Sequence, residues 1–253
     1  MNLLRSIWMA FSMFSRFPTP KVEWEADSMA YMLAAFPLVG CVIGLLLWAW
    51  IWVCGALSLG TALYAAGLTL IPVAATGGIH LDGFCDVVDA LASHGDKKRK
   101  RAILKDPHAG AFAVIGVCAY MLMYFALCTE LAPKRGVLLC LAHVLARAVS
   151  GLAGLCFPTA GSGLLHTFSQ SAKKKASAGI LLGWFVLGVA AASLLHPATG
   201  LAMGASALAC AGGVYRMSVR QFGGMSGDLA GYLLQSGELI MLFSIVCIGK
   251  AGI

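Results

Sequence analysis

Long uninterrupted runs of apolar residues, separated by short polar segments, dominate the chain. A helix needs about 20 apolar residues to cross the hydrocarbon core of a bilayer, because each residue adds about 1.5 Å along its axis. The runs therefore predict an all-α, polytopic membrane bundle of about seven transmembrane helices. We place the spans at residues 30–54, 57–76, 109–131, 136–157, 179–195, 200–215 and 229–249.

The composition supports a membrane environment. Hydrophobic residues make up 60% of the chain, charged residues 11%, and the mean hydropathy is +0.85. A soluble domain carries about 25% charged residues, so this chain lacks the polar side chains that would cover a soluble fold. The net charge of +7 is typical of a membrane protein with basic cytoplasmic loops, and nucleic acid is not an expected partner.

The distribution of basic residues predicts the orientation. With the N-terminus in the cytoplasm, 14 of the 18 Lys and Arg residues fall in cytoplasmic segments, as the positive-inside rule requires. We therefore expect a single membrane-embedded domain over residues 1–253 with its N-terminus inside. Residues 1–28 would form an interfacial segment with an amphipathic helix, and residues 77–108 the longest cytoplasmic loop.

The segment 77–89 carries the densest chemical signal, with Asp82, Asp86 and Asp89 spaced i, i+4, i+7. On a helix these positions share one face, where like charges repel unless a cation lies among them. A small set of carboxylate ligands with room for water and phosphate suits Mg²⁺. Gly77 and Gly78 permit a tight turn or the close approach of a phosphate. The alternative is a solvated acidic face, although the interleaved apolar residues make the segment amphipathic.

Basic and polar residues follow this segment. The run 96–101 sets topology and attracts anionic lipid, or steers a phosphorylated substrate to the acidic residues. Lys105 is a candidate phosphate contact, whereas Asp106 is either a further ligand or an ordinary turn residue before proline. His80, within the acidic segment, is a candidate hydrogen-bond donor or phosphate contact.

A second glycine-rich turn, over residues 223–228, brings Gly224 and Asp228 to the start of the last predicted span. It lies on the same predicted face of the membrane as the first acidic segment. Arg220, just before the glycines, has the side chain best suited to bind a phosphate.

Two ionisable residues, Arg147 and Glu238, fall inside predicted spans. An ionised side chain within a span costs roughly 2.5–3.5 kcal/mol on insertion scales, so such residues are candidates for function. The structural alternative is that the two pair with each other.

These residues together favour phosphoryl-group transfer at the cytoplasmic face. One rival is a CDP-alcohol phosphotransferase, but its D-x-x-D-G-x-x-A-R pattern needs an Ala-Arg pair that this chain does not supply. The other rival is a transporter or channel with Arg147 and Glu238 along its pathway. The clustering of carboxylates on one face, and the lack of a visible inverted repeat, argue against transport.

The string GGIHLDGFCDVVDAL, at residues 77–91, resembles the signature of the cobalamin synthase family, the adenosylcobinamide-GDP ribazoletransferases. The resemblance runs over almost the whole chain. Further matching elements are Arg16 with 17–20, residues 36–40, Lys105-Asp106 with Gly110, Arg147, and 223–228 with Glu238. Three positions depart from the family pattern: Ser226 stands for threonine, Pro107-His108 for Ser-Arg, and Ala90 for glycine.

The resemblance implies a Mg²⁺-dependent phosphotransferase that joins adenosylcobinamide-GDP and α-ribazole, or its 5′-phosphate, with release of GMP. It implies that Asp82 and Asp86, with Asp89 or Asp228, hold Mg²⁺, and that Asp89 is a candidate general base. Lys105, Arg147 or Arg220 would stabilise the charge that develops in the transition state. The implied substrate-binding residues are Gly77, Gly78, Asp106, Arg220, Gly224 and Glu238, with His80 beside the reacting groups.

The resemblance also implies a location and partners. The expected site is the bacterial cytoplasmic (inner) membrane, with a multi-pass chain and an active site that faces the cytoplasm. The expected partners are the corrinoid substrate, α-ribazole and the lipid bilayer. A homo-oligomer and contacts with other enzymes of nucleotide-loop assembly stay open.

Overall fold

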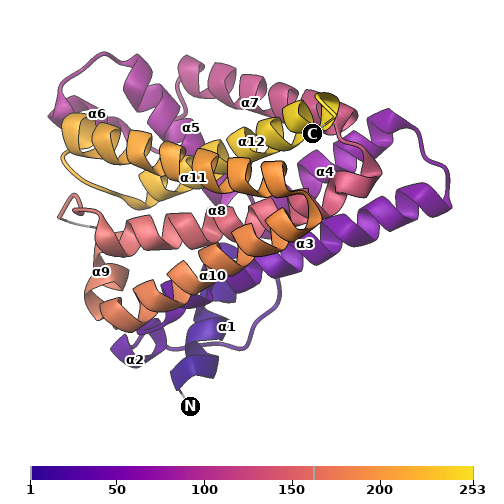
Figure 1. The fold of residues 1–253 in the computed structure, drawn as a ribbon. Helices are drawn as coiled ribbons and strands as arrows, with labels where there is room; N and C mark the ends of the chain where they lie inside the picture. Colours follow the sequence, from indigo (N-terminus) through magenta and orange to yellow (C-terminus); the bar gives the residue numbers. More distant parts are fainter. Residues whose placement is uncertain (1, 162, 253) are drawn as a thin grey trace.

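A computed structural model describes residues 2–161 and 163–252 as a bundle of helices joined by turns (Figure 1). Within these described ranges, six helices are long and apolar enough to cross a membrane. They are α3 (Met32–Ala56), α7 (Ala111–Glu130), α8 (Gly136–Cys156), α10 (Lys174–Leu195), α11 (Pro197–Met217) and α12 (Gly227–Lys250). The predicted all-α, polytopic membrane bundle is confirmed, while its N-in orientation stays a prediction.

The predicted span 57–76 corresponds to α4 (Thr61–Thr76), which continues into α5 (Ile79–Ala92) through a bend of 95°. A seventh span results only if this bent pair crosses the membrane as one unit. The bend falls at Gly77 and Gly78, whose φ angles of +65° and +80° lie in the left-handed region that glycine adopts at no steric cost. The predicted tight turn is thus confirmed. Because α5 turns away from the direction of α4, we count it outside the spanning segments.

The spans predicted at 179–195 and 200–215 are too short. Helix α10 begins at Lys174 and helix α11 at Pro197. The first turn of α10 is polar, so a search for apolar residues misses it. Proline lacks an N–H and has a fixed φ, which suits the first position of a helix and lets α11 begin directly after α10.

Much of each predicted polar connection is helical. The connection 77–108 holds α5 and α6 (Lys97–Ile103), and 216–228 holds the π-helical turn η2 (Ser218–Phe222). The connection 158–178 holds α9 (Leu164–Ser171), and its residue 162 lies outside the described residues. Asp96 explains the start of α6, because its Oδ1 accepts a hydrogen bond of 2.8 Å from the Arg99 N–H.

The N-terminal segment forms the predicted helix, α1 (Asn2–Phe14), followed by the short α2 (Ala26–Met29). Helix α1 packs against α3. Ser6, Met9 and Ala10, spaced i, i+3, i+4, are buried on one face of the helix, whereas Arg5 and Ser12 are exposed. This is the two-faced pattern expected of an interfacial helix, and the position of α1 at a membrane surface stays a prediction.

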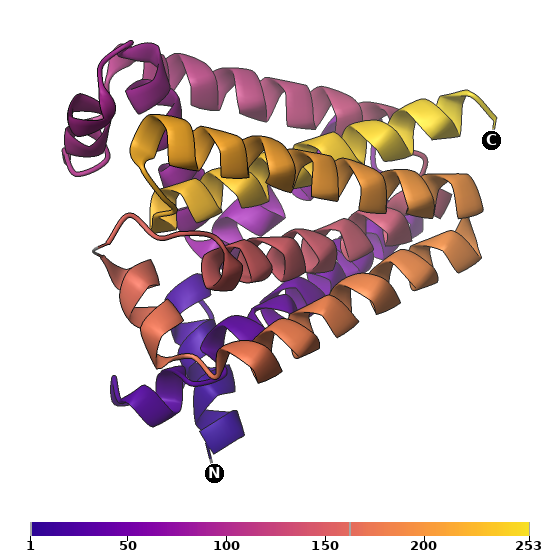
Figure 2. The ribbon, with the colours of Figure 1, turned by 60° about the vertical axis from the view of Figure 1, so that its left-hand side comes forward.

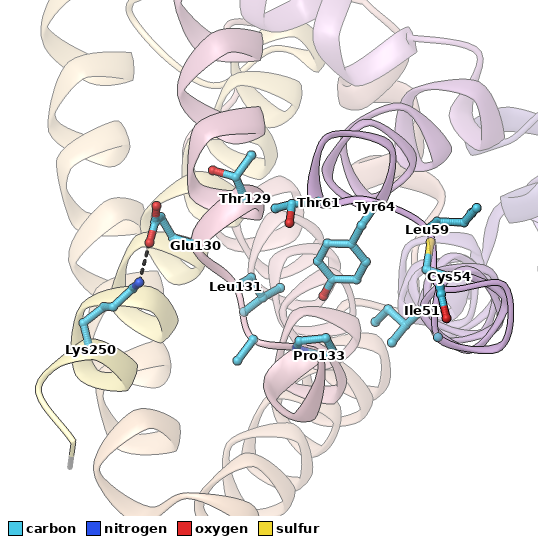
Figure 3. Close-up of a pocket in the computed structure, with 13 residues that line it drawn as sticks. Ile51, Cys54, Leu59, Thr61, Tyr64, Thr129, Glu130, Leu131, Pro133 and Lys250 are labelled. Carbon is cyan, nitrogen blue, oxygen red and sulfur yellow. Dashed lines mark ion pairs between the residues drawn. The ribbon is translucent and has the colours of Figure 1, made fainter.

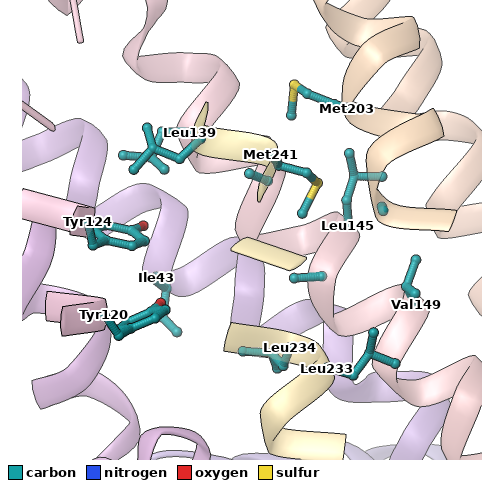
Figure 4. Close-up of a cluster of buried hydrophobic side chains, with 14 of the residues drawn as sticks. Ile43, Tyr120, Tyr124, Leu139, Leu145, Val149, Met203, Leu233, Leu234 and Met241 are labelled. Carbon is teal, nitrogen blue, oxygen red and sulfur yellow. The ribbon is translucent and has the colours of Figure 1, made fainter. Parts of the chain in front are cut away.

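Helix α8 lies at the centre of the bundle, in contact with α3, α10, α11 and α12. The core between these helices is filled by Leu145 and Val149 of α8, Met203 of α11 and Met241 of α12 (Figure 4). The long helices lie side by side, with the short helices α1, α2, α6 and α9 near one end and the C-terminus at the other (Figure 2). The N-terminal end of α12, which carries Asp228, therefore lies at the end where the short helices gather.

Candidate functional site

The candidate site forms where α5 crosses the start of α12. A Cβ atom at Gly83 would lie 2.9 Å from the Cα atom of Asp228, so a side chain there would force the two helices apart. Glycine at this position brings Asp82, one residue earlier, close to the glycine-rich turn 223–228, which ends at Asp228. The structure thus joins two motifs that lie far apart in the sequence.

A cavity of about 190 Å³ opens beside this crossing. It is lined by residues of α1, α3, α5, α8, α9 and α12, and we call it the aromatic cavity. Asp82 and Asp228 both line it, together with His80. Its other walls are mainly apolar, with Met13, Phe14, Leu33, Phe36, Leu165 and Phe168.

His80 packs between aromatic rings in this cavity. Its ring centre lies 6.0 Å from that of Phe14 and 5.4 Å from that of Phe36. The side chain is 6% exposed, and its Nε2 atom has no hydrogen-bond partner among the described residues. A buried polar atom without a partner costs about 1–3 kcal/mol, which makes Nε2 a candidate ligand contact.

The carboxylates of this region repel one another. Burial, and then the charges of Asp82, Asp228 and Asp89, raise the pKa of Asp86 to about 6. In the described part of the chain no three Asp, Glu, His or Cys side chains already stand at the spacing of a metal site. The donor set nevertheless fits a hard divalent cation, because oxygen ligands are what Mg²⁺ takes and a cation would offset this repulsion.

The structure gives Asp89 a contact of its own. Its Oδ1 accepts a hydrogen bond of 3.3 Å from the Ala113 N–H in the first turn of α7. The carboxylate also fills the space beside Gly110, where a Cβ atom would collide with Oδ1. One oxygen of Asp89 is therefore committed to the N-terminus of α7. The roles of Asp89 as metal ligand and general base stay predictions.

A second cavity, of about 510 Å³, adjoins the first. Its wall includes Arg101, Lys105 and Gly224, and we call it the basic cavity. The two cavities share Asp228 and Leu165 among their lining residues. Lys105 and Gly224, which the sequence singled out, therefore lie next to the acidic crossing.

Arg101 is a site residue that the sequence analysis did not single out. Its Nε–H donates a hydrogen bond to the carbonyl oxygen of Phe222, and the neighbouring Lys100 donates one of 2.5 Å to Gln221 Oε1. These bonds fasten α6 to η2 and hold Arg101 at the basic cavity. The basic run was the available signal, but only the fold shows which of its members faces the glycine-rich turn.

The start of α12 supplies a further polar feature. Ser226 caps the helix, because its Oγ accepts a hydrogen bond of 3.3 Å from the Leu229 N–H. The remaining N–H groups of the first turn carry partial positive charge and favour an anion. Gly224, with a φ of +146°, lets the chain pass close to Thr159 before this helix begins.

Two predicted substrate contacts lie apart from the cavities. Asp106 is exposed and accepts a hydrogen bond of 3.0 Å from the His108 N–H, as expected of a residue that starts a turn. This bond lowers the pKa of Asp106 below its ordinary value. Arg220 is exposed on η2, and the described lining of the basic cavity includes Arg101 but not Arg220.

Arg147 and Glu238 form the ion pair that the sequence analysis gave as an alternative. Arg147 Nη1 lies 2.7 Å from Glu238 Oε1, and the two side chains are 1% and 2% exposed. His143 Nδ1 also lies 2.7 Å from Glu238 Oε1. His143 was not among the candidate residues, although it stands four residues before Arg147 on the same helix face. The pair is enclosed within the bundle, and its predicted contact with substrate stays untested.

A further cavity, of about 440 Å³, lies near the other end of α12 (Figure 3). Tyr64, Thr129, Glu130 and Lys250 are among its lining residues, and Glu130 pairs with Lys250 at its edge. Because Asp228 is at the first turn of α12 and Lys250 at its end, this cavity is remote from the acidic crossing. The aromatic and basic cavities are therefore the candidate site.

Comparison with known proteins agrees with the chemistry of this site. The model of the cobalamin-5-phosphate synthase family matches residues 6–246. An adenosylcobinamide-GDP ribazoletransferase from Lachnoclostridium phytofermentans is 41% identical over 97% of this chain and 95% of its own. Proteins with the same name from Clostridium perfringens strain 13 and Geobacillus kaustophilus are 33% and 30% identical, over 96% and 92% of this chain and 98% and 92% of their own. No solved structure matches the chain.

Proposed function

Because the chain belongs to the cobalamin-5-phosphate synthase family, we propose that it joins adenosylcobinamide-GDP to α-ribazole or α-ribazole 5′-phosphate. A ribose hydroxyl oxygen of the acceptor forms a bond to the phosphorus that carries the cobinamide. The bond from that phosphorus to the GMP oxygen breaks, and GMP leaves. The hydroxyl proton passes to a base on the enzyme. The product is adenosylcobalamin or its 5′-phosphate.

The observation that carries this proposal is the meeting of the aromatic cavity, with its two carboxylates, and the basic cavity at Asp228. A diphosphate needs positive charge along its oxygens, which Arg101, Lys105 and the first turn of α12 supply on one side. On the other side, a carboxylate can accept the hydroxyl proton. Phosphoryl transfer consists mainly of such positioning and charge stabilisation.

We further propose that Asp82 and Asp228 hold Mg²⁺, because both line the aromatic cavity next to the basic one. When bound, Mg²⁺ would neutralise charge on the diphosphate and on the leaving GMP. Asp86, beside these two residues, is then the better candidate for the base. A carboxyl group whose pKa is about 6 takes up a proton near neutral pH more readily than an ordinary aspartate.

The site is proposed to face the cytoplasm from the inner membrane. The cavities are lined in part by residues of α1 and by Arg101 of α6, and these two helices hold six of the 14 basic residues assigned to the cytoplasmic side. A homo-oligomer and contacts with other enzymes of nucleotide-loop assembly remain expectations.

The test uses the purified full chain in detergent or liposomes with adenosylcobinamide-GDP, α-ribazole 5′-phosphate and Mg²⁺. We expect GMP release together with a new corrinoid product, and loss of both with EDTA. GMP release that continues in EDTA would contradict the metal proposal alone. No release from folded protein, under conditions in which a relative works, would contradict the function.

The raised pKa of Asp86 predicts a pH dependence. Below about pH 6 its carboxyl group is protonated in the ion-free protein and cannot accept the hydroxyl proton. The rate of GMP release at saturating substrate should therefore fall as the pH falls, by about tenfold per pH unit once the group is mostly protonated. A bound cation would move this fall to lower pH.

The pH profile of the Asp86→Asn variant is the control. This variant should be slow at every pH and should lose the acidic fall, while its half-saturating Mg²⁺ concentration at pH 7 stays near that of the wild type. An unchanged acidic fall in Asp86→Asn would assign the titration to another group.

A further inference from the structure

The aromatic cavity offers a ligand very little polar chemistry. Apart from the two carboxylates at its edge, its only polar side chains among the described residues are His80 and Ser150. The Ser150 hydroxyl already donates a hydrogen bond of 3.0 Å to the carbonyl oxygen of Ala230. His80 Nε2 is therefore the polar atom that a ligand could satisfy.

The walls around this atom suit one flat ring system. Phe14 and Phe36 flank the imidazole, and Phe168 lines the same space. An apolar cavity of about 150 Å³ holds a benzene molecule, so a cavity of about 190 Å³ suits a small planar base and excludes a corrinoid.

We propose that the aromatic cavity binds the base of the acceptor nucleoside, with His80 Nε2–H donating a hydrogen bond to its free ring nitrogen. This inference rests on the proposed function and deepens it, because it assigns each substrate to a cavity. A dimethylbenzimidazole base has an apolar ring and a single free ring nitrogen, which matches one unpartnered donor. Guanine has several donors and acceptors along its edge, and a cavity with one polar partner would leave most of them unsatisfied.

The assignment also gives a consistent geometry. A base in the aromatic cavity brings its ribose toward Asp82 and Asp228, which line that cavity. The nucleoside diphosphate of the other substrate occupies the basic cavity, beside Arg101 and Lys105. The two substrates then meet at Asp228, the charged residue that lines both cavities.

The test measures binding directly, without turnover. The purified full chain in detergent is dialysed against α-ribazole, and separately against the analogue in which the free ring nitrogen is replaced by C–H. Loss of one hydrogen bond to a buried donor predicts that the wild type binds α-ribazole about tenfold more tightly than the analogue. The His80→Phe variant keeps an aromatic ring but has no donor, and it should bind both compounds equally.

Two matched variants separate a specific contact from a packing role. Phe168→Ala should weaken the binding of both compounds and leave the ratio of their dissociation constants unchanged. Lys105→Gln should weaken the binding of GDP, used as a probe of the basic cavity, and leave the dissociation constant of α-ribazole unchanged. The test stays decisive if His80→Phe does not fold. The preference of the wild type for α-ribazole over the analogue is measured without that variant, and Phe168→Ala and Lys105→Gln supply the controls.

Equal binding of the two compounds by the wild type, no binding of α-ribazole, or an undiminished preference in folded His80→Phe would each overturn the proposal. Its failure is distinct from that of the proposed function. Tenfold preference with no GMP release would leave the base site intact and remove the function. GMP release without this preference would do the reverse.

Discussion

Replacement of Asp82 with asparagine is expected to lower the rate of GMP release by at least about 10²-fold, because loss of even an outer partner of a metal ligand costs 10–100-fold. Asp82 lines the aromatic cavity together with Asp228, and these two carboxylates would hold the proposed ion. Asparagine keeps the size of the side chain and one oxygen but removes the charge. The measurement is GMP release over a range of Mg²⁺ concentrations, with circular dichroism and gel filtration to check folding.

The comparison with Asp86 makes this experiment specific. Asp82→Asn should raise the Mg²⁺ concentration needed for half-maximal rate, whereas Asp86→Asn should lower the maximal rate with little change in that concentration. Glu130→Gln, an exposed carboxylate at the other end of the bundle, is the matched control and should retain the wild-type rate. Full activity of Asp82→Asn at ordinary Mg²⁺ concentrations would remove the metal site from the mechanism.

Local sequence signals predicted the elements that hold this site. Gly77 and Gly78 predicted the turn into α5, because only glycine adopts their left-handed backbone without strain. The aspartate spacing puts the three carboxylates on one face if the segment is helical, and the structure has a helix there. Such features depend on neighbours within a few residues, so they can be recognised in a single sequence.

The contacts between distant segments could not be predicted in the same way. Gly83 packs on Asp228 and Arg101 bonds to the carbonyl of Phe222, yet nothing in the spacing of these residues along the chain indicates either contact. The cap that Asp89 provides for α7 is likewise a property of the folded chain. The sequence thus singled out Asp82 and Asp228, which line one cavity, while the separate environment of each carboxylate follows from packing.

The basic run at 96–101 is a case in which the sequence leaves two explanations open and the fold shows the contacts. From sequence it is explained by membrane topology or by substrate steering, and the two explanations are compatible. In the fold, Lys100 is 8% exposed and bonded to Gln221, while Arg101 lines the basic cavity. The departure at Pro107-His108, where the family has Ser-Arg, is therefore accompanied by another arginine at the cavity.

A second large effect is expected on stability rather than on chemistry. Removal of one member of the buried pair, as in Arg147→Met, should lower the free energy of unfolding by about 3–5 kcal/mol, since it leaves the partner's charge buried without compensation. Among the described residues, Glu238 would then keep His143 as its ion-pair partner, with both side chains almost fully enclosed. The measurement is unfolding of the purified protein in mixed detergent micelles.

The double variant Arg147→Met/Glu238→Gln should recover much of this loss, because it removes both charges and the amide that replaces the carboxylate keeps a hydrogen bond to His143. Glu130→Gln breaks the exposed pair with Lys250 and should change the free energy of unfolding by about 1 kcal/mol or less. Recovery of the free energy of unfolding in the double variant, together with recovery of GMP release, would show that the pair has a structural role. The pair would then support the site through Phe36, whose ring centre lies 5.7 Å from Arg147 Cζ. A double variant that folds as well as the wild type but does not turn over would instead return Arg147 or Glu238 to the set of residues that act on the substrate.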